Sequence, residues 1–244
     1  MPQASNNGQS DSTSVRQLDL MEHLAELRSR IFRSLIFICA GTVLSWFFYG
    51  IFFHLLTAPV GRKLLITGIA EGFIIKMQVS LVLGLIVSAP FVAWQGWAFV
   101  APGLTSDERR HVVFAVPLSV FLFWAGIVAG YVVLPPCIGW LAEQNPPDAV
   151  FMPNVKSTIL FILWLCLAFG IVFQLPVLLI FLAKIGLVNS KFLKTHWRYA
   201  ILLISIVAAI GTPTNDPFTF VMMFVPMCLL YFVSIWLVKL VEKK

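Results

Sequence analysis

The chain has 244 residues, of which 59% are hydrophobic and only 11% are charged. A soluble domain carries about 25% charged residues, so this chain has too few charges to cover a surface that faces water. The composition excludes a soluble enzyme, a nucleic-acid-binding domain and a secreted disulfide-stabilised domain. It predicts an all-α integral membrane protein, because the apolar runs are long and continuous rather than alternating. We interpret the net charge of +6 as a signal of membrane orientation.

The chain begins with a polar segment. Residues 1–15 are rich in Ser, Asn and Gln, and we expect them to form a disordered N-terminal tail. Residues 16–244 are expected to form a single membrane domain. The four cysteines form no CxxC pair and the histidines are scattered, so the sequence indicates packing cysteines, no metal site and no cofactor.

The apolar runs predict the membrane spans. A helix needs about 20 apolar residues to cross a bilayer core of about 30 Å. Four runs are long enough, a fifth has only 13 residues, and Pro226 breaks the last: 34–53, 77–101, 112–134, 159–183, 199–211 and 218–238. Six spans is the natural count. The alternative is that residues 199–238 form a re-entrant hairpin, because 10–14 apolar residues more often indicate that arrangement.

The distribution of Lys and Arg predicts the orientation of the spans. With the N-terminus inside, thirteen of the 17 Lys and Arg residues fall in cytoplasmic segments, and both termini are cytoplasmic. The other four lie on the outer side: Arg62, Lys63, Lys76 and Lys156. Lys76 is expected to snorkel to the outer interface. Residues 54–72 and 135–157 are expected to be outward loops that lie on the membrane.

Two cytoplasmic segments carry carboxylates. Leu20, Leu24, Leu27 and Ile31 follow one helical stripe, so the segment before the first span is predicted to be an amphipathic helix. Glu26 faces Arg30 at i,i+4 on this helix. By itself, such a pair is an ordinary surface interaction of a few tenths of a kcal/mol.

The second carboxylate lies in the loop before the third span. Thr105-x-x-Glu108 fits a capping box, which is a purely structural role. Together with Glu26, however, Glu108 would form an acidic spot inside a basic rim. Paired guanidinium groups bind carboxylates bidentately, so this spot suits a short cationic motif.

Short motifs follow one another along nearly the whole chain. They are His23-Leu24-x-Glu26-Leu27-Arg28-x-Arg30, Ala58-Pro59, Ser88-Ala89-Pro90, Gln95-x-Trp97-x-Phe99-x-x-Pro102-Gly103-Leu104, Glu108-Arg109-Arg110, Gly130-Tyr131, Phe169-Gly170-x-x-Phe173-x-x-Pro176-Val177, Arg198-Tyr199 and Thr212-Pro213-x-x-Asp216-Pro217. Each motif alone is weak. In this order and spacing, they resemble the TatC family, the multispanning receptor of the twin-arginine protein translocase.

The resemblance implies a concave, glove-like bundle of six transmembrane helices, with the fifth and sixth short. It implies a protein of the bacterial cytoplasmic (inner) membrane that binds Arg-Arg signal peptides of folded cargo at its cytoplasmic face. Export would be driven by the proton gradient, without enzymatic activity. The implied partners are single-span subunits of the TatA and TatB type, further copies of the chain and the lipid bilayer, with no role for nucleic acid.

The resemblance also implies roles for individual residues. Glu26 and Glu108 match the family's signal-peptide-binding carboxylates, and the neighbours in that site are Arg28, Phe99 and Leu104. Three further matches lie on the outward half: Pro59, Tyr131 and Asp216.

Three positions depart from the family pattern, and some matches have structural alternatives. Gln174 stands where the family often carries Glu in the fourth span, so it can contact a partner but carries no charge. Phe220 and Phe232 replace polar residues in the last span. Structurally, Pro59 can shape a loop, Asp216 can cap a helix that Pro217 begins, and Gln174 can satisfy the carbonyl freed by Pro176.

A different class of function is a secondary transporter or channel for a small solute. Such a protein needs polar groups near the middle of the membrane, where this chain offers little besides Gln174. A peptide receptor needs them at the cytoplasmic surface, where Glu26 and Glu108 lie. The sequence therefore favours the receptor.

Overall fold

The computed structural model describes residues 7–100, 106–146, 148, 152–212, 214 and 216–242. Within these ranges, side chains are described for residue 21, for residues 23–100 and from residue 115 onward. Every regular element in the described part is a helix, apart from one isolated β-bridge between Leu65 and Asn154. The predicted all-α class is confirmed.

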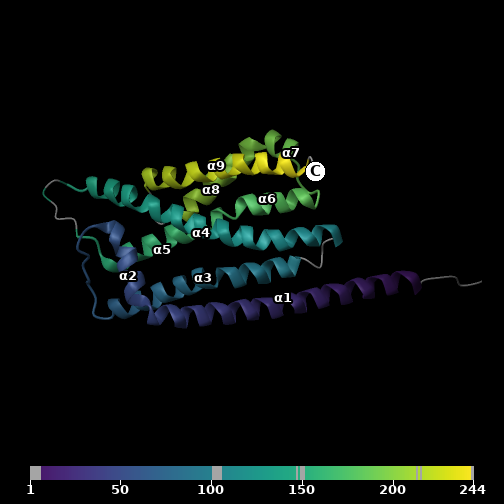
Figure 1. Cartoon of the computed structure of the whole chain (residues 1–244), viewed down its shortest axis with the longest axis horizontal. Coiled ribbons are helices and arrows are strands. Elements are labelled where there is room, and N and C mark those ends of the chain that lie inside the picture. The colour runs from purple at the N-terminus through teal and green to yellow at the C-terminus, as the bar shows by residue number, and fades with distance from the viewer. Residues whose placement is uncertain are drawn as a thin grey trace, which may run out of the picture.

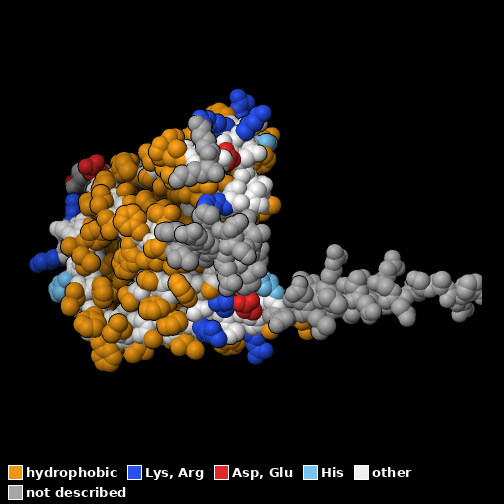
Figure 2. All heavy atoms as spheres, turned by 45° about the vertical axis from the view of Figure 1, so that its right-hand side comes forward, with side chains coloured by type: hydrophobic (Ala, Val, Ile, Leu, Met, Phe, Trp, Pro, Cys, Tyr) orange, Lys and Arg blue, Asp and Glu red, His pale blue; other side chains and the backbone are white. Residues whose placement is uncertain are grey.

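The long helices run side by side along the length of the molecule, and α2 crosses them at one end (Figure 1). In chain order they are α1 (Asn7–Phe47), α2 (Tyr49–Thr57), the 3-10 turn η1 (Ala58–Val60), α3 (Glu71–Val100), α4 (Ser106–Glu143), α5 (Val155–Val172), α6 (Leu175–Lys184), α7 (Ser190–Thr195), α8 (Trp197–Gly211) and α9 (Pro217–Glu242). α1 packs on α3, α4 packs on α5, and α6 packs on α9. Figure 2 shows a broad hydrophobic band across the middle of the molecule, with Lys and Arg side chains gathered toward its two ends.

Five helical segments in the described part are long and apolar enough to cross a membrane. They are His23–Phe47, Glu71–Val100, Ala115–Glu143, Val155–Lys184 and Pro217–Glu242. Two shorter apolar helices are also described, Tyr49–Val60 and Trp197–Gly211. Trp197–Gly211 lies where the short fifth span is expected, and with the five long segments it accounts for the predicted six.

The expectation of a short sixth helix is wrong. α9 has 26 residues and continues through Pro226. Proline is tolerated within transmembrane helices because neighbouring groups satisfy the freed carbonyl. A hairpin of two short helices is therefore not supported, since α9 is long enough to cross by itself.

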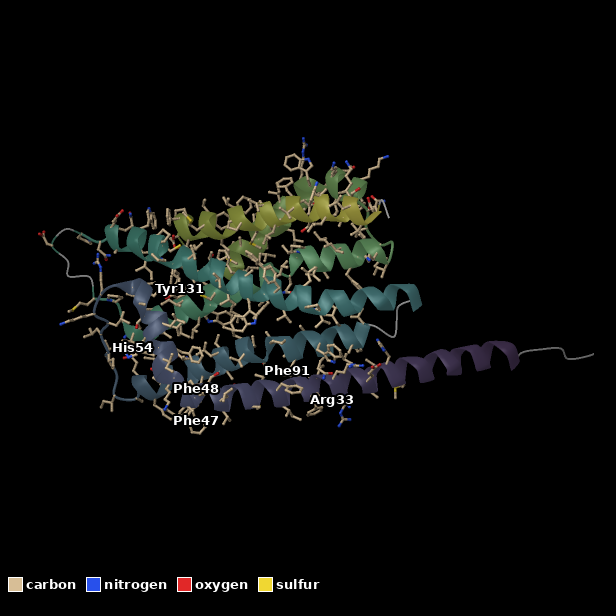
Figure 3. All side chains as sticks on the ribbon, viewed as in Figure 1. Arg33, Phe47, Phe48, His54, Phe91 and Tyr131 are labelled. Atoms are coloured by element: carbon tan, nitrogen blue, oxygen red, sulfur yellow. The ribbon has the colours of Figure 1, made fainter. Side chains whose placement is uncertain are left out.

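The first predicted run, 34–53, is not one helix. α1 ends at Phe47, and Phe48 leaves the helical conformation with φ −95° and ψ 9° before α2 begins (Figure 3). Lys76 packs at this break between α1 and α2, where its Nζ lies 4.3 Å from the ring centroid of Trp46 and 5.7 Å from that of Tyr49. The ammonium group thus lies against aromatic faces on both sides of the break.

Two other predicted boundaries also differ. Residues 135–157 were expected to form a loop, but α4 continues through Pro135 and Pro136 as far as Glu143. Leu134 and Cys137 beside these prolines have no exposed surface, so close packing keeps this part helical. At the N-terminus, α1 already includes residues 7–15, which we expected in a disordered tail. Extending an existing helix is easy compared with nucleating one.

Glycines allow the closest helix contacts. A Cβ on Gly84 of α3 would lie 2.6 Å from the Cα of Thr42 on α1, and a Cβ on Gly126 of α4 would lie 2.6 Å from the carbonyl oxygen of Phe169 on α5. Helix backbones can approach this closely in a membrane only where side chains are absent. These crossings fix α1 against α3 and α4 against α5.

Candidate functional site

The N-terminal half of α1 carries the first carboxylate of the predicted site. Arg30 Nε and Nη2 both donate to Oε1 of Glu26, at 3.0 and 2.6 Å. Arg30 makes no bond to the second oxygen, Oε2, which lies 3.9 Å from His23 Nδ1. The Glu26 side chain is 32% exposed.

α3 supplies the other wall of this site. Phe99 stacks on His23 with ring centroids 4.4 Å apart and an interplanar angle of 21°. One turn earlier, Gln95 Oε1 accepts from Arg30 Nη1 at 3.4 Å. Gln95 and Phe99 are four residues apart and therefore share one face of α3. Glu26 thus lies beside an aromatic surface, in a site that two helices build together.

The structure brings together only some of the predicted residues. Glu26 and Phe99 meet through His23, but Arg28 is exposed and lies over Phe32, with Cζ 5.8 Å from the ring centroid. Residues two apart on a helix face different directions, which explains this separation. Leu104 lies outside the described residues. Glu108 lies on α4, and its side chain is outside the described part of the chain, as is its capping partner Thr105.

Gln174 takes part in a polar contact between helices. Its Nε2 donates to the backbone carbonyl of Ser119 on α4 at 3.0 Å, and Trp97 Nε1 donates to Ser119 Oγ at 2.9 Å. Gln174 sits in the break between α5 and α6, just before Leu175. The carbonyl that it satisfies belongs to α4, and not to its own helix as the alternative role beside Pro176 would require.

The cluster of Trp97, Ser119 and Gln174 borders a cavity of about 490 Å³. Its other lining residues are nearly all apolar and come from α1, α3, α4 and α6: Ile38, Leu85, Ala89, Val92, Ala93, Gly96, Val100, Val120, Phe123, Leu178 and Phe181. Sequence reasoning missed Ser119, since a lone serine in an apolar run carries no signal. Trp97 stood in a quoted motif without an assigned role.

Two of the residues that were expected on the outward half make structural contacts. Tyr131 on α4 donates its hydroxyl to the carbonyl of Leu55 on α2 at 2.8 Å and so ties these helices together (Figure 3). Pro59 lies in η1, before Gly61 turns the chain with φ 61°. This agrees with the loop-shaping role considered from the sequence.

Asp216 caps α9. Its Oδ1 accepts from the backbone N–H of Thr219 at 2.7 Å, and its Oδ2 accepts from the Thr214 hydroxyl. Burial opposes ionisation of this carboxyl, but these hydrogen bonds outweigh burial and hold the pKa of Asp216 below its usual range. The N-cap role predicted from Asp216-Pro217 is confirmed.

A further carboxylate, Glu71, was not predicted from the sequence. It is only 6% exposed, and its Oε2 accepts from the backbone N–H groups of Thr67 and Gly68 at 2.6 and 2.9 Å. Asn154 donates to the Thr67 hydroxyl at 2.9 Å, which fastens the loop to the start of α5. Glu71 thus orders the loop that leads into α3. Among the residues that the structure describes, no cluster of three potential metal ligands occurs.

Comparison with known proteins places the chain in a family. The family model described as Sec-independent protein translocase protein (TatC) matches residues 22–226. A TatC protein of Desulforapulum autotrophicum is 39% identical over 221 residues, covering 88% of this chain and 82% of that protein. A TatC protein of Carboxydothermus hydrogenoformans is 34% identical over 233 residues, covering 94% of this chain and 96% of that protein.

A solved structure agrees with this assignment. The crystal structure of a twin arginine translocase receptor TatC superimposes with a TM-score of 0.80 at 32% sequence identity, and the match covers 90% of this chain and 99% of that chain. The fold expected from the resemblance is therefore confirmed, apart from the length of the sixth helix. This chain belongs to the TatC family, and it is a non-enzymatic component of a Sec-independent protein translocase.

Proposed function

We propose that this protein is the signal-peptide receptor of its translocase and binds the arginine pair of the peptide with Glu26 and Glu108. The observation that carries the proposal is the geometry of Glu26. Its Oε1 is engaged by Arg30, while Oε2 receives no bond from that arginine. A guanidinium from a peptide can therefore bind Oε2 without first breaking the existing ion pair.

The surroundings of Glu26 suit such a ligand. The Phe99 ring beside His23 offers apolar surface for residues next to the arginine pair. Arg30 also holds the carboxylate in place, so less side-chain freedom is lost on binding. Glu108 on α4 would supply the second carboxylate, with Leu104 as an apolar neighbour and exposed Arg28 at the rim of the site.

The remaining parts of the proposal concern the membrane and the assembly. We propose that both termini lie in the cytoplasm, that the protein resides in the bacterial inner membrane, and that the proton gradient drives export of folded cargo. Single-span subunits of the TatA and TatB type and further copies of this chain would complete the complex. Gln174 beside its apolar cavity is a candidate contact for such a single helix.

Glutamine substitutions test the recognition site. A charge-assisted hydrogen bond contributes about 1.5–3 kcal/mol, against about 1 for a neutral one. Glu26→Gln and Glu108→Gln should each lower the affinity for an Arg-Arg peptide several-fold, with the double variant weakest, and salt should mimic this in part. Binding is measured in nanodiscs, with the melting temperature in parallel. Glu143→Gln, an exposed change at the other end of α4, is the matched control.

A further variant separates the carboxylate from its ion pair. Arg30→Gln keeps the charge of Glu26 and removes its internal partner, so peptide binding should persist. If Arg30→Gln abolishes binding as completely as Glu26→Gln, the ion pair has a structural role and the proposal fails for Glu26. If Glu108→Gln binds the peptide normally, Glu108 is only a helix cap.

A further inference from the structure

A groove opens between α7, α8 and α9. α7 and the C-terminal end of α9 lie at the end of the molecule where the N-terminal half of α1 also lies (Figure 1). It has a volume of about 610 Å³, and its lining is two lysines, two tryptophans and two apolar residues: Lys194, Trp197, Phe232, Ile235, Trp236 and Lys239. None of these residues belongs to the proposed signal-peptide site.

The groove has a charged end and an apolar wall. Phe232, Trp236 and Lys239 follow the helical spacing of four and three, so they share one face of α9. Ile235 forms the floor and is 5% exposed, whereas Trp236 is 61% exposed. Lys239 lies seven positions after Phe232, so the wall extends about 10 Å from Phe232 to Lys239 at 1.5 Å per residue.

Hydrogen bonds fix the shape of the groove. The Tyr231 hydroxyl donates to the carbonyl of Leu193 at 2.9 Å, within the buried contact of α9 with α7. At the end of α9, Glu242 accepts from the Ser190 N–H at 2.6 Å and from the Ser190 hydroxyl. α7 is therefore held against α9 at Ser190 and at Leu193, the residue before Lys194, and these bonds position Lys194 beside α9.

The charge of the groove is positive. Within the described part of the chain, no carboxylate lies within ion-pair distance of Lys194 or Lys239. Lys191 and Arg198 on the neighbouring turns are exposed and add to the positive field, while the Glu242 carboxylate is bound to Ser190. Figure 2 shows Lys and Arg side chains gathered over this end of α7 and α9, beside the hydrophobic band.

We propose that this groove binds an anionic phospholipid, with the phosphate between Lys194 and Lys239 and the acyl chains along Phe232 and Trp236. Tryptophan is favoured at the boundary between headgroups and hydrocarbon, and basic pockets between transmembrane helices bind anionic headgroups. A free phosphate would leave the apolar wall empty, and a zwitterionic lipid would gain little from two ammonium groups. The bound lipid would hold the corner of α7 and α8 at a fixed depth in the membrane.

Native mass spectrometry of the purified full-length chain tests this proposal. Phosphatidylglycerol and phosphatidylcholine with the same acyl chains are titrated separately, together with glycerophosphoglycerol, which has no acyl chains. Each lysine near an anionic headgroup contributes about a fivefold factor in affinity. Lys194→Gln and Lys239→Gln should each weaken phosphatidylglycerol binding about fivefold. Lys191→Gln removes the same charge from the exposed face of α7 and should change the affinity less than about twofold.

Three results would overturn the proposal. The first is equal binding of phosphatidylcholine and phosphatidylglycerol by the unmodified chain. The second is equal binding of glycerophosphoglycerol, which would indicate a phosphate site rather than a lipid site. The third is a loss of phosphatidylglycerol affinity in Lys191→Gln as large as in Lys194→Gln. This would show that the lipid is attracted by the overall positive charge of this surface and not bound in the groove. The comparison of lipids on the unmodified chain decides the matter even if a variant folds poorly.

Discussion

Replacing Gly84 by alanine should force α1 and α3 apart. The new Cβ would collide with the Thr42 hydroxyl oxygen and would lie 2.5 Å from the Thr42 nitrogen and 2.6 Å from its Cα. Ordinary contact begins near 3.4 Å, so the two backbones must separate by roughly 0.8 Å. Two of the three contacts are with backbone atoms, and rotation of the Thr42 side chain cannot relieve them.

The expected loss follows from overpacking. Extra methyl groups in a packed core cost about 1–3 kcal/mol, whereas alanine in an open helical position gains up to about 1 kcal/mol over glycine. A Cβ on Gly96 of the same helix would meet nothing within 4 Å, so Gly96→Ala isolates the propensity gain. Gly84→Ala should therefore melt roughly 2–12 °C below Gly96→Ala.

Thermal unfolding of the detergent-solubilised chain, followed by tryptophan fluorescence, measures this difference. Adding Thr42→Ala to Gly84→Ala removes only the hydroxyl contact, so it should not restore the melting temperature. Gly41→Ala acts on the same crossing, because its Cβ would lie 2.7 Å from the Gly84 carbonyl oxygen, and its effect should not add fully to that of Gly84→Ala. Equal melting temperatures for Gly84→Ala and Gly96→Ala would refute the close crossing.

Three other predictions concern single sites. Asp216→Ala should lose about 1 kcal/mol of stability at pH 7. Folding lowers the pKa of Asp216, so its contribution to stability is complete above the unfolded value of 3.8 and should fade as the pH falls through the folded value. The stabilities of the unmodified chain and of Asp216→Ala should therefore converge in acid. Denaturation at a series of pH values below neutral measures this. Gln174→Leu should lower the stability of the isolated chain by about 0.6 kcal/mol, because it removes the hydrogen bond to the Ser119 carbonyl. An unchanged melting temperature would mean that this bond does not stabilise the chain and that the Gln174 amide can bind a partner instead. Single cysteines at Ser106 and Ser190, in a chain without native cysteines, should resist an impermeant thiol reagent added outside cells, and labelling of either one would contradict cytoplasmic termini.

The sequence by itself determined the membrane class and most of the helices. Long uncharged runs can cross a bilayer only as helices, because every backbone polar group must be satisfied within the segment. The cap at Asp216 and the pair of Glu26 and Arg30 were also predictable, since both are local interactions within one turn of helix.

Only the tertiary structure decided where the helices end and which distant side chains meet. The break at Phe48 and the continuation of α4 through Pro135 depend on packing against neighbouring helices, which no local pattern encodes. The bond from Gln174 to Ser119 joins residues that are 55 positions apart. The groove at Lys194 and Lys239 likewise combines separate helices. Such contacts arise from packing between elements, whereas composition and periodicity act within a single element.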